Sequence, residues 1–366
     1  MVFCLINIFL VTDVLLLFIF FELIILPLFL LIGIWGSRDR KIYAAYLLFI
    51  YTLLGSALAL LSFIILYFNK GTFNFIYFNN SLFLEQYQIL VVLLLFFGFS
   101  VKIPIAPIHI WLPEAHVEAP TVGSVILAGI ILKLGIYVYL RLILFTFNFI
   151  IFKLMSLFFF IAFISLYISS FSALAQIDIK KVIAYSSIAH MNFSLIGLFC
   201  NNLVAILGAF FMMFGHAIVS GALFFCIGML YDRYKTRILF YYGGIVILMP
   251  IWVFLFFIFI LGNFGLPGTV NFVGEFIIFI GSFFVNNYII FCLLIGLFLT
   301  LIYSLFLFTK IVFGGLKVEF IRFFSDLSRR ESYILLILLI LVIYFGINAN
   351  VLLDFGFSSL FFWFFY

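Results

Sequence analysis

The stretch Val101–Pro113, with the sequence VKIPIAPIHIWLP, decides how this chain can fold. It holds three prolines and Lys102, yet it continues an apolar run that begins near residue 88. Proline lacks the backbone donor of a helix and clashes with the preceding turn, so a helix cannot pass through these residues unbroken. Broken backbone at membrane depth is tolerated only where protein or a water-filled cavity satisfies its polar groups. The stretch therefore predicts an interrupted transmembrane helix beside an internal polar site.

The composition of the whole chain supports a membrane location. Of 366 residues, 68% are hydrophobic and only 8% are charged, whereas soluble domains are about 45–50% apolar and about 25% charged. So few charges cannot cover a water-exposed surface, which excludes a soluble enzyme, a disordered chain, a coiled coil and a nucleic-acid binder. We expect an all-α, polytopic transmembrane helical bundle, in contact with lipids and not with nucleic acid.

Apolar runs divide the chain into spans, since a helix needs about 20 apolar residues to cross a bilayer. We predict one membrane domain, residues 1–366, with ten full spans and a shorter apolar stub at residues 2–11. The predicted spans are 13–35, 42–68, 88–112, 121–145, 153–175, 179–200, 203–230, 246–285, 287–312 and 332–353. The aromatic tail 357–366 is too short to span and is predicted to lie at the interface.

Basic residues gather in alternate loops and predict the orientation of the chain. The opposite loops offer little beyond Lys70 and Lys153. By the positive-inside rule, the basic loops face the cytoplasm or the mitochondrial matrix. Their basic residues are Arg38, Arg40, Lys41, Lys180, Lys181, Arg233, Lys235, Arg237, Lys317, Arg322, Arg329 and Arg330.

A second interruption lies at Gly262–Glu275, with the sequence GNFGLPGTVNFVGE. Together with the first, it gives one broken helix to each half of the chain, which is typical of transporters built from inverted repeats. We therefore predict two inverted repeats, about 1–145 and 151–313, followed by one C-terminal helix at 332–353. The alternative is that the two interruptions are ordinary proline kinks.

Ionisable residues at mid-span are the strongest functional signal. Each costs about 2.5–3.5 kcal/mol to insert at the centre of a membrane helix. Six spans each place one such group near the same depth, which predicts a proton relay along a central polar axis. The six residues are Glu22, Lys102, Lys133, His190, His216 and Glu275.

Each of these residues also has a simpler interpretation. Either lysine could reach toward an interface with its long stem. Glu22 could form a structural ion pair with a lysine. His190 or His216 could be a hydrogen-bonded core histidine, and Glu275 could cap the helix that restarts after the second interruption.

Two further features bear on cofactors. The loop EAHVE, residues 114–118, carries two carboxylates and a histidine that could form a proton entry, a metal site or only a structural turn. The sequence has no dinucleotide fingerprint, phosphate-binding loop or paired haem-ligand pattern. We therefore predict that this chain itself holds no cofactor or metal.

At these same residues the sequence resembles the antiporter-like subunits of respiratory complex I, from about Asp13 to Leu353. The motifs that carry the resemblance are VKIPIAPIHIWLPEAHVEAPTVGS (101–124), LAGIILKLGIY (127–137), DIKKVIAYSSIAHM (178–191) and GLPGTVNFVGE (265–275).

The resemblance implies a proton-translocating module coupled to NADH oxidation and ubiquinone reduction in partner subunits. Glu22 and Lys102 match the carboxylate and lysine that gate the channel. Lys133, His190 and His216 match its relay, and Glu275 matches the carboxylate that serves the exit side or a neighbouring subunit. NAD, FMN, iron–sulfur clusters and ubiquinone would then belong to the partner subunits.

The resemblance also implies partners and a location. By this resemblance the chain begins within the family's fourth helix and lacks the first three, so accessory subunits are expected to cover that flank. Neighbouring antiporter-like subunits of the membrane arm are expected as further partners. The 58 phenylalanines suit an organellar gene, which favours the mitochondrial inner membrane over a bacterial plasma membrane. Two other functions stay open: a subunit of a sodium/proton antiporter complex, and a structural scaffold with a vestigial channel.

Overall fold

The computed structural model describes residues 1–75, 78, 84–144, 146–317 and 325–365, with side chains up to residue 358. Arg322, residue 145 and Tyr366, which figure in the predictions above, lie outside these residues. The described chain is helical, apart from isolated bridges that join Asp13 to Asn74 and Asp178 to Ile238. The predicted all-helical class is therefore confirmed.

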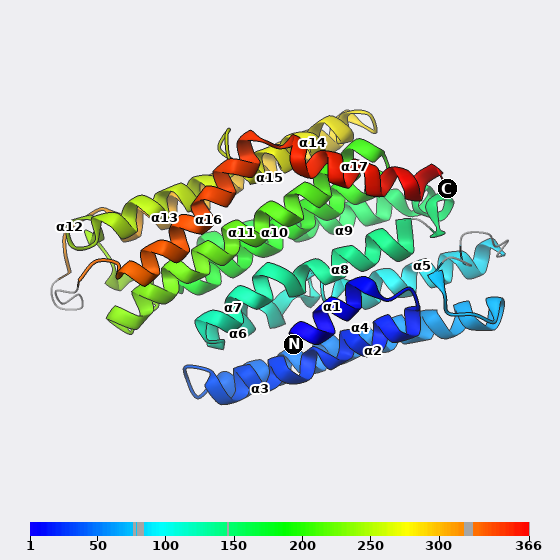
Figure 1. Ribbon diagram of the computed structural model, residues 1–366, viewed down its shortest axis with the longest axis horizontal. Helices are drawn as coiled ribbons and strands as arrows, with labels where there is room; N and C mark the ends of the chain where they lie inside the picture. Colours follow the sequence, from blue (N-terminus) through cyan, green and yellow to red (C-terminus); the bar gives the residue numbers. More distant parts are fainter. Residues whose placement is uncertain (76–77, 79–83, 145, 318–324, 366) are drawn as a thin grey trace.

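Most of the helices run roughly along the long axis of the molecule (Figure 1). The first group is α1 (Val2–Leu10), α2 (Val14–Leu23), α3 (Ile25–Trp35), α4 (Lys41–Lys70), α5 (Glu85–Ser100), α6 (Trp111–Glu118), α7 (Thr121–Ile126) and α8 (Leu132–Val138). The second is α9 (Asn148–Ala175), α10 (Ile179–Phe199), α11 (Leu203–Tyr234), α12 (Ile245–Leu248), α13 (Pro250–Asn263), α14 (Val270–Phe283), α15 (Asn287–Val312), α16 (Arg329–Ile347) and α17 (Asn350–Phe365).

Within the described residues, eight helical segments are long and apolar enough to cross a membrane. Helices α2 and α3 count as one of them, and so does the run Thr121–Leu144, in which α7 and α8 alternate with π-helical turns. Helices α5, α13 and α14 are apolar but shorter. The chain is thus a polytopic membrane protein, as the composition predicts.

Both proline-rich stretches interrupt a helix where the sequence predicts. The predicted span 88–112 appears as α5, which ends at Ser100, before the irregular backbone around Pro104. The predicted span 246–285, which contains the second predicted interruption, forms α12, α13 and α14, and its main break lies between α13 and α14 at residues 264–269. Pro267 and two glycines with positive φ, Gly265 and Gly268, prevent a continuous helix there.

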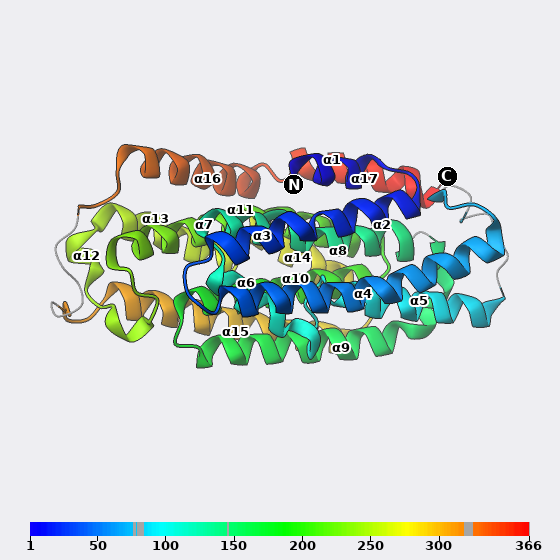
Figure 2. The same cartoon turned by 90° about the horizontal axis from the view of Figure 1, so that it is seen from below.

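The C-terminal region differs from the prediction. The helix expected at 332–353 ends at Ile347, and the chain continues as α17, which extends through the tail predicted to lie at the interface. The break falls at Asn348 and precedes Asn350, and asparagine is a poor helix former. In Figure 2, α16, α17 and α1 lie along one long face of the molecule. Apolar pattern alone did not reveal this break.

Side-chain caps fix where several helices begin. Asp13 accepts from the amide of Leu15 at the start of α2, and Asn202 accepts from Ala205 at the start of α11. Ser328 and Glu331 form a capping box at the start of α16. These polar residues interrupt apolar runs, which is why the sequence predicts most helix starts to within a few residues.

Helices α10 and α11 lie between the first group on one side and α13 to α16 on the other (Figure 1), and they form the core of the bundle. Nearly every side chain of α10 is buried. Helix α11 packs closely against α14 through glycines: a Cβ on Gly274 would lie 2.7 Å from the Met212 nitrogen, and one on Gly281 would lie 2.6 Å from the Ala205 Cα. Small residues let membrane helices approach this closely. His216 and Glu275 thus sit on two tightly joined helices.

Candidate functional site

Lys133 belongs to α8, directly after a π-helical turn at Leu127–Ile131. Its Nζ atom donates to the carbonyl of Ala128 in that turn and lies 2.8 Å from Nδ1 of His216 on α11. A π-helical turn shifts the backbone hydrogen bonds by one residue and often occurs at functional sites. The amine therefore points into the bundle, toward His216, and not toward an interface.

His216 and His190 face each other across α11 and α10. Their ring centroids are 5.4 Å apart, and both side chains are buried. The Nε2 atom of each ring has no hydrogen-bond partner among the described residues. Neither histidine is therefore a core residue whose two nitrogens are both satisfied by other protein groups.

Glu275 continues this arrangement on α14. Its Oε1 atom lies 3.8 Å from Nδ1 of His190. The carboxylate also packs directly against the backbone of Gly265 in the second interruption, where any Cβ would collide with it. Thr269 occupies the N-cap position of α14, so Glu275, more than a turn inside the helix, does not cap it. Four predicted site residues on four helices thus form one contiguous row.

Lys102 and Glu22 form a second, looser group. Lys102 is buried, and its Nζ atom lies 4.5 Å from the ring centroid of Phe21. Glu22 is close enough for its charge to interact with that of Lys102, but the described residues form no ion pair between them. Its Oε1 atom is buried without a hydrogen-bond partner in this part of the chain. The two charges are neighbours, and the direct pair considered from the sequence is not formed.

An internal cavity of about 20 Å³ adjoins Lys102, which is room for about one water molecule. Apart from Lys102, its lining is mostly apolar, and Thr52 contributes a hydroxyl-bearing side chain. Leu127, Ile131 and Leu134 close the cavity on the side of the helix that carries Lys133. Among the described residues, no hydrogen bond or ion pair joins Lys102 to Lys133.

The EAHVE stretch, predicted as a loop, is helical and forms the second half of α6. It does not bring its three polar side chains together. Glu114 pairs with Lys181 at 2.5 Å, and Glu118 lies 3.8 Å from Arg237. His116 points elsewhere and stacks on Phe224, with ring centroids 4.6 Å apart. Within the described chain, no group of three or more His, Cys, Asp or Glu residues could hold a metal ion.

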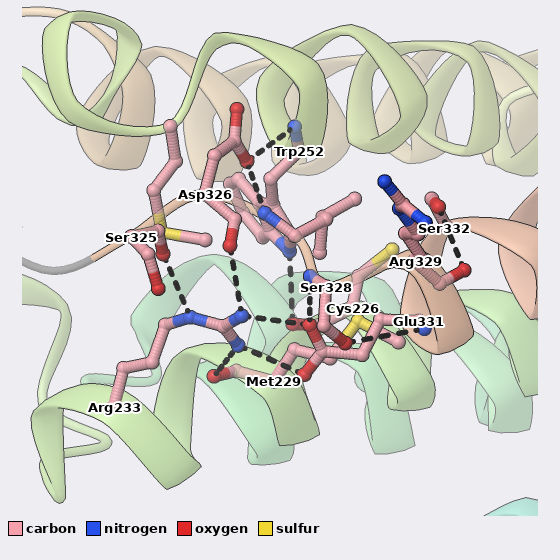
Figure 3. Close-up of polar contacts among 12 residues, drawn as sticks. Cys226, Met229, Arg233, Trp252, Ser325, Asp326, Ser328, Arg329, Glu331 and Ser332 are labelled. Carbon is pink, nitrogen blue, oxygen red and sulfur yellow. Dashed lines mark hydrogen bonds and ion pairs between the residues drawn. The ribbon is translucent and has the colours of Figure 1, made fainter.

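Arg233, predicted only as an inside-facing basic residue, ties three helices together near the end of α11 (Figure 3). Its guanidinium group donates to both carboxylate oxygens of Glu331 on α16, at 3.0 and 2.7 Å, and to the carbonyl of Asp326. The Asp326 carboxylate in turn accepts from the amides of Ile251 and Trp252 in α13. Bidentate pairs of this kind are geometrically specific, so they fix α11 against α13 and α16.

Two asparagines in the second interruption were quoted in the sequence motif but given no role there. Asn263 ends α13 and Asn271 lies in the first turn of α14, and both are buried. The one available signal was spacing, because Asn271 precedes Glu275 by four residues and so shares its helix face.

Residues 11–302 match the family model described as NADH:quinone oxidoreductase/Mrp antiporter, transmembrane. The fold agrees: the chain superposes with a TM-score of 0.89 on a chain of respiratory complex I from Thermus thermophilus, at 24% identity over 97% of this chain and 76% of that one. A chain of the Mrp complex from Dietzia sp. DQ12-45-1b gives a TM-score of 0.89 at 18% identity, covering 96% and 74% of the two chains. The chain belongs to this family of antiporter-like membrane subunits.

Its curated relatives narrow the assignment. The chain is 47% identical to NADH-ubiquinone oxidoreductase chain 4 of Marchantia polymorpha, over 96% of this chain and 71% of the relative. It is 39% identical to NADH-quinone oxidoreductase subunit M of Rhodobacter capsulatus, over 95% and 70% of the two chains. Within the family, the chain therefore groups with chain 4 of NADH-ubiquinone oxidoreductase, the counterpart of bacterial subunit M.

Proposed function

We propose that this chain translocates protons as a membrane subunit of NADH:ubiquinone oxidoreductase, through a relay that runs along Lys133, His216, His190 and Glu275. The row formed by these four side chains is the observation that carries the proposal. Proton transfer between side chains needs donor and acceptor within about 2.6–3.2 Å, or one water molecule between them. At 2.8 Å, Lys133 and His216 meet that requirement directly.

The remaining steps need a bridging water or a small movement. His190 and Glu275 are 3.8 Å apart at their nearest polar atoms, slightly beyond hydrogen-bonding distance. The rings of His216 and His190 approach each other with their Nε2 atoms unpaired. A proton received by His216 can therefore pass to ring nitrogens that have no other hydrogen-bond partner among the described residues.

Glu22 and Lys102 act on this relay by charge. Charges interact across several ångströms, more strongly inside a protein than in water, and such an interaction needs no hydrogen bond. When Glu22 moves away from a charged Lys102, the positive charge of Lys102 disfavours a second positive charge at Lys133. When Glu22 approaches, Lys102 is compensated and Lys133 can hold its proton. The pair thus gates the loading of Lys133.

The proposal includes the setting of the subunit. NADH oxidation and ubiquinone reduction take place in partner subunits, which hold the redox cofactors, and neighbouring antiporter-like subunits adjoin this chain. The Marchantia polymorpha and Arabidopsis thaliana relatives of this chain are both called NADH-ubiquinone oxidoreductase chain 4, which supports the mitochondrial inner membrane as its location. The broken helices, one at Lys102 and one before Glu275, support the two inverted repeats.

Replacement of Lys133 by Met tests this function. The assembled complex carrying Lys133→Met is reconstituted in proteoliposomes, and proton uptake is measured per NADH oxidised. Methionine has a similar length and no charge, so we expect the fold to persist and proton uptake to fall at least about 100-fold. Lys153→Met, at an exposed lysine paired with Glu85, is the matched control and is expected to leave uptake unchanged. Wild-type uptake by Lys133→Met would rule out the relay.

A further inference from the structure

Several buried polar atoms near the second interruption have no hydrogen-bond partner in the described part of the chain. These atoms belong to residues that are at most 3% exposed. They are His190 Nε2, His216 Nε2, Asn263 Oδ1, Asn271 Oδ1, Asn271 Nδ2, Glu275 Oε1 and Tyr303 Oη. Buried polar groups in proteins are almost always hydrogen-bonded, to protein or to ordered water. A cluster of this size points to a bound polar ligand.

Asn271 packs against the residue before His216 and shares a helix face with Glu275. It precedes Glu275 by one helical turn on α14, and side chains four residues apart share a helix face. Its Oδ1 atom packs against Gly215 on α11, where a Cβ would lie 2.5 Å from it. Gly215 directly precedes His216. The amide therefore sits at the α11–α14 contact, beside both His216 and Glu275.

Asn263 approaches the same cluster from the opposite side of the interruption. It is the last residue of α13, is 3% exposed and lies next to His190, with which its side chain and backbone interact. Its Oδ1 atom has no hydrogen-bond partner within the described chain. Two carboxamides thus flank the row of histidines and Glu275.

We propose that Asn263 and Asn271 form a water-binding site that bridges His216, His190 and Glu275. This proposal rests on the proposed relay and names what connects its last three groups. A carboxamide both donates and accepts, so each asparagine can orient a water molecule between a histidine nitrogen and the Glu275 carboxylate. A carboxamide does not titrate in the physiological range, so both asparagines are positioning residues and the proton moves through the water.

Asn192 shows that a buried asparagine can have a hydrogen-bond partner within its own helix. Asn192 lies on α10 and is also fully buried; its Nδ2 atom donates to the carbonyl of Ile188 at 2.8 Å, and only its Oδ1 atom lacks a partner among the described residues. It is a buried amide with a local structural partner. Asn271, by contrast, has neither of its polar atoms paired among the described residues. Asn192 is therefore the matched control.

The test uses the assembled complex in proteoliposomes with Asn271→Leu, Asn271→Ser and the control Asn192→Leu. Leucine fills the space without polar atoms, so we expect Asn271→Leu to slow proton uptake about tenfold or more, which corresponds to about 1.4 kcal/mol in the barrier. Serine keeps a donor and an acceptor and leaves room for a second water, so Asn271→Ser is expected to retain most of the uptake. Asn192→Leu is expected to pump at the wild-type rate.

A second readout separates positioning from mere stability. The ratio of uptake rates in H₂O and D₂O is expected to change in Asn271→Leu and to stay at the wild-type value in Asn192→Leu. Equal rates and equal isotope ratios for Asn271→Leu and wild type would overturn the water site. So would equal losses in Asn271→Leu, Asn271→Ser and Asn192→Leu, which would indicate packing alone.

The two proposals fail in distinguishable ways. If Lys133→Met abolishes uptake while Asn271→Leu leaves it unchanged, the relay stands and the water site is wrong. If Lys133→Met pumps normally, the relay itself is wrong, and with it the water site that depends on it.

Discussion

The two interrupted helices place their ionisable residues in contrasting surroundings. At the first interruption, Lys102 lies beside an aromatic ring and a small, mostly apolar cavity, and its neighbour Glu22 is near without forming an ion pair. At the second, Glu275 lies within a polar cluster that contains two histidines and two asparagines. Similar breaks in the backbone thus adjoin two neighbouring charges without an ion pair in one case and a connected row of polar side chains in the other.

The contrast corresponds to two different physical requirements. A charge acts on another charge across several ångströms, and more strongly where few polar groups screen it. A proton moves only between groups in hydrogen-bonding contact or linked by water. The surroundings of Lys102 therefore suit control by charge, whereas those of Glu275 suit transfer.

Arginine substitutions give the largest expected effect and test this contrast directly. Arginine keeps a positive charge but does not release its proton in proteins. Lys133→Arg is expected to reduce proton uptake about 100-fold, because transfer to His216 requires deprotonation. Lys102→Arg keeps the charge beside Glu22 and is expected to retain uptake within about tenfold of the wild type. Proton uptake by the reconstituted complex measures both.

Assembly of each arginine variant is verified first, by the amount of complex recovered from the membrane. Equal losses in the two variants, at equal assembly, would show that both lysines must release protons. The distinction between a charge-controlling region and a transferring region would then be wrong.

A smaller effect is expected at the glycine contact that holds His216 and Glu275 together. A Cβ at position 274 would lie 2.7 Å from the Met212 nitrogen and 2.8 Å from its Cα. Backbone atoms cannot rotate away, so α11 and α14 must separate. Gly274→Ala is expected to destabilise the protein by about 1–3 kcal/mol, measured as a lower thermal transition of the purified complex.

Gly315 provides the control for this substitution, since a Cβ there would meet no atom within 4 Å. Gly315→Ala is expected to leave the transition unchanged. If Gly274→Ala also left the thermal transition unchanged, the close contact of α11 and α14 would not be what holds His216 and Glu275 together.

The sequence predicted the two interruptions and the position of Lys102 and Glu275 beside them, for clear physical reasons. Proline and glycine disrupt a helix wherever they occur in it. A charge within an apolar run has a depth that follows from residue counting, at 1.5 Å per residue. Lys102 and Glu275 were located in this way, each beside its interruption.

The contacts between helices could not be predicted in the same way. In helices that are apolar all round, the sequence carries little information about which face meets which neighbour. Lys133 and His216 are 83 residues apart, and their contact depends on the π-helical turn before Lys133. The sequence likewise suggested that Glu22 and Lys102 are neighbours, but it did not show that they form no ion pair. The roles of Asn263 and Asn271 became apparent only with the packing of α11 against α14.

The central claim is that a proton passes directly from Lys133 to His216. Its most direct test is the initial rate of proton uptake in Lys133→Met, in His216→Leu and in the double variant, at matched assembly. If both residues serve one step, the second substitution has nothing further to remove, and the double variant is predicted to retain the same residual rate as either single variant. A residual rate equal to the product of the two fractions of wild-type rate that the single variants retain would show that the residues act independently and would contradict direct transfer.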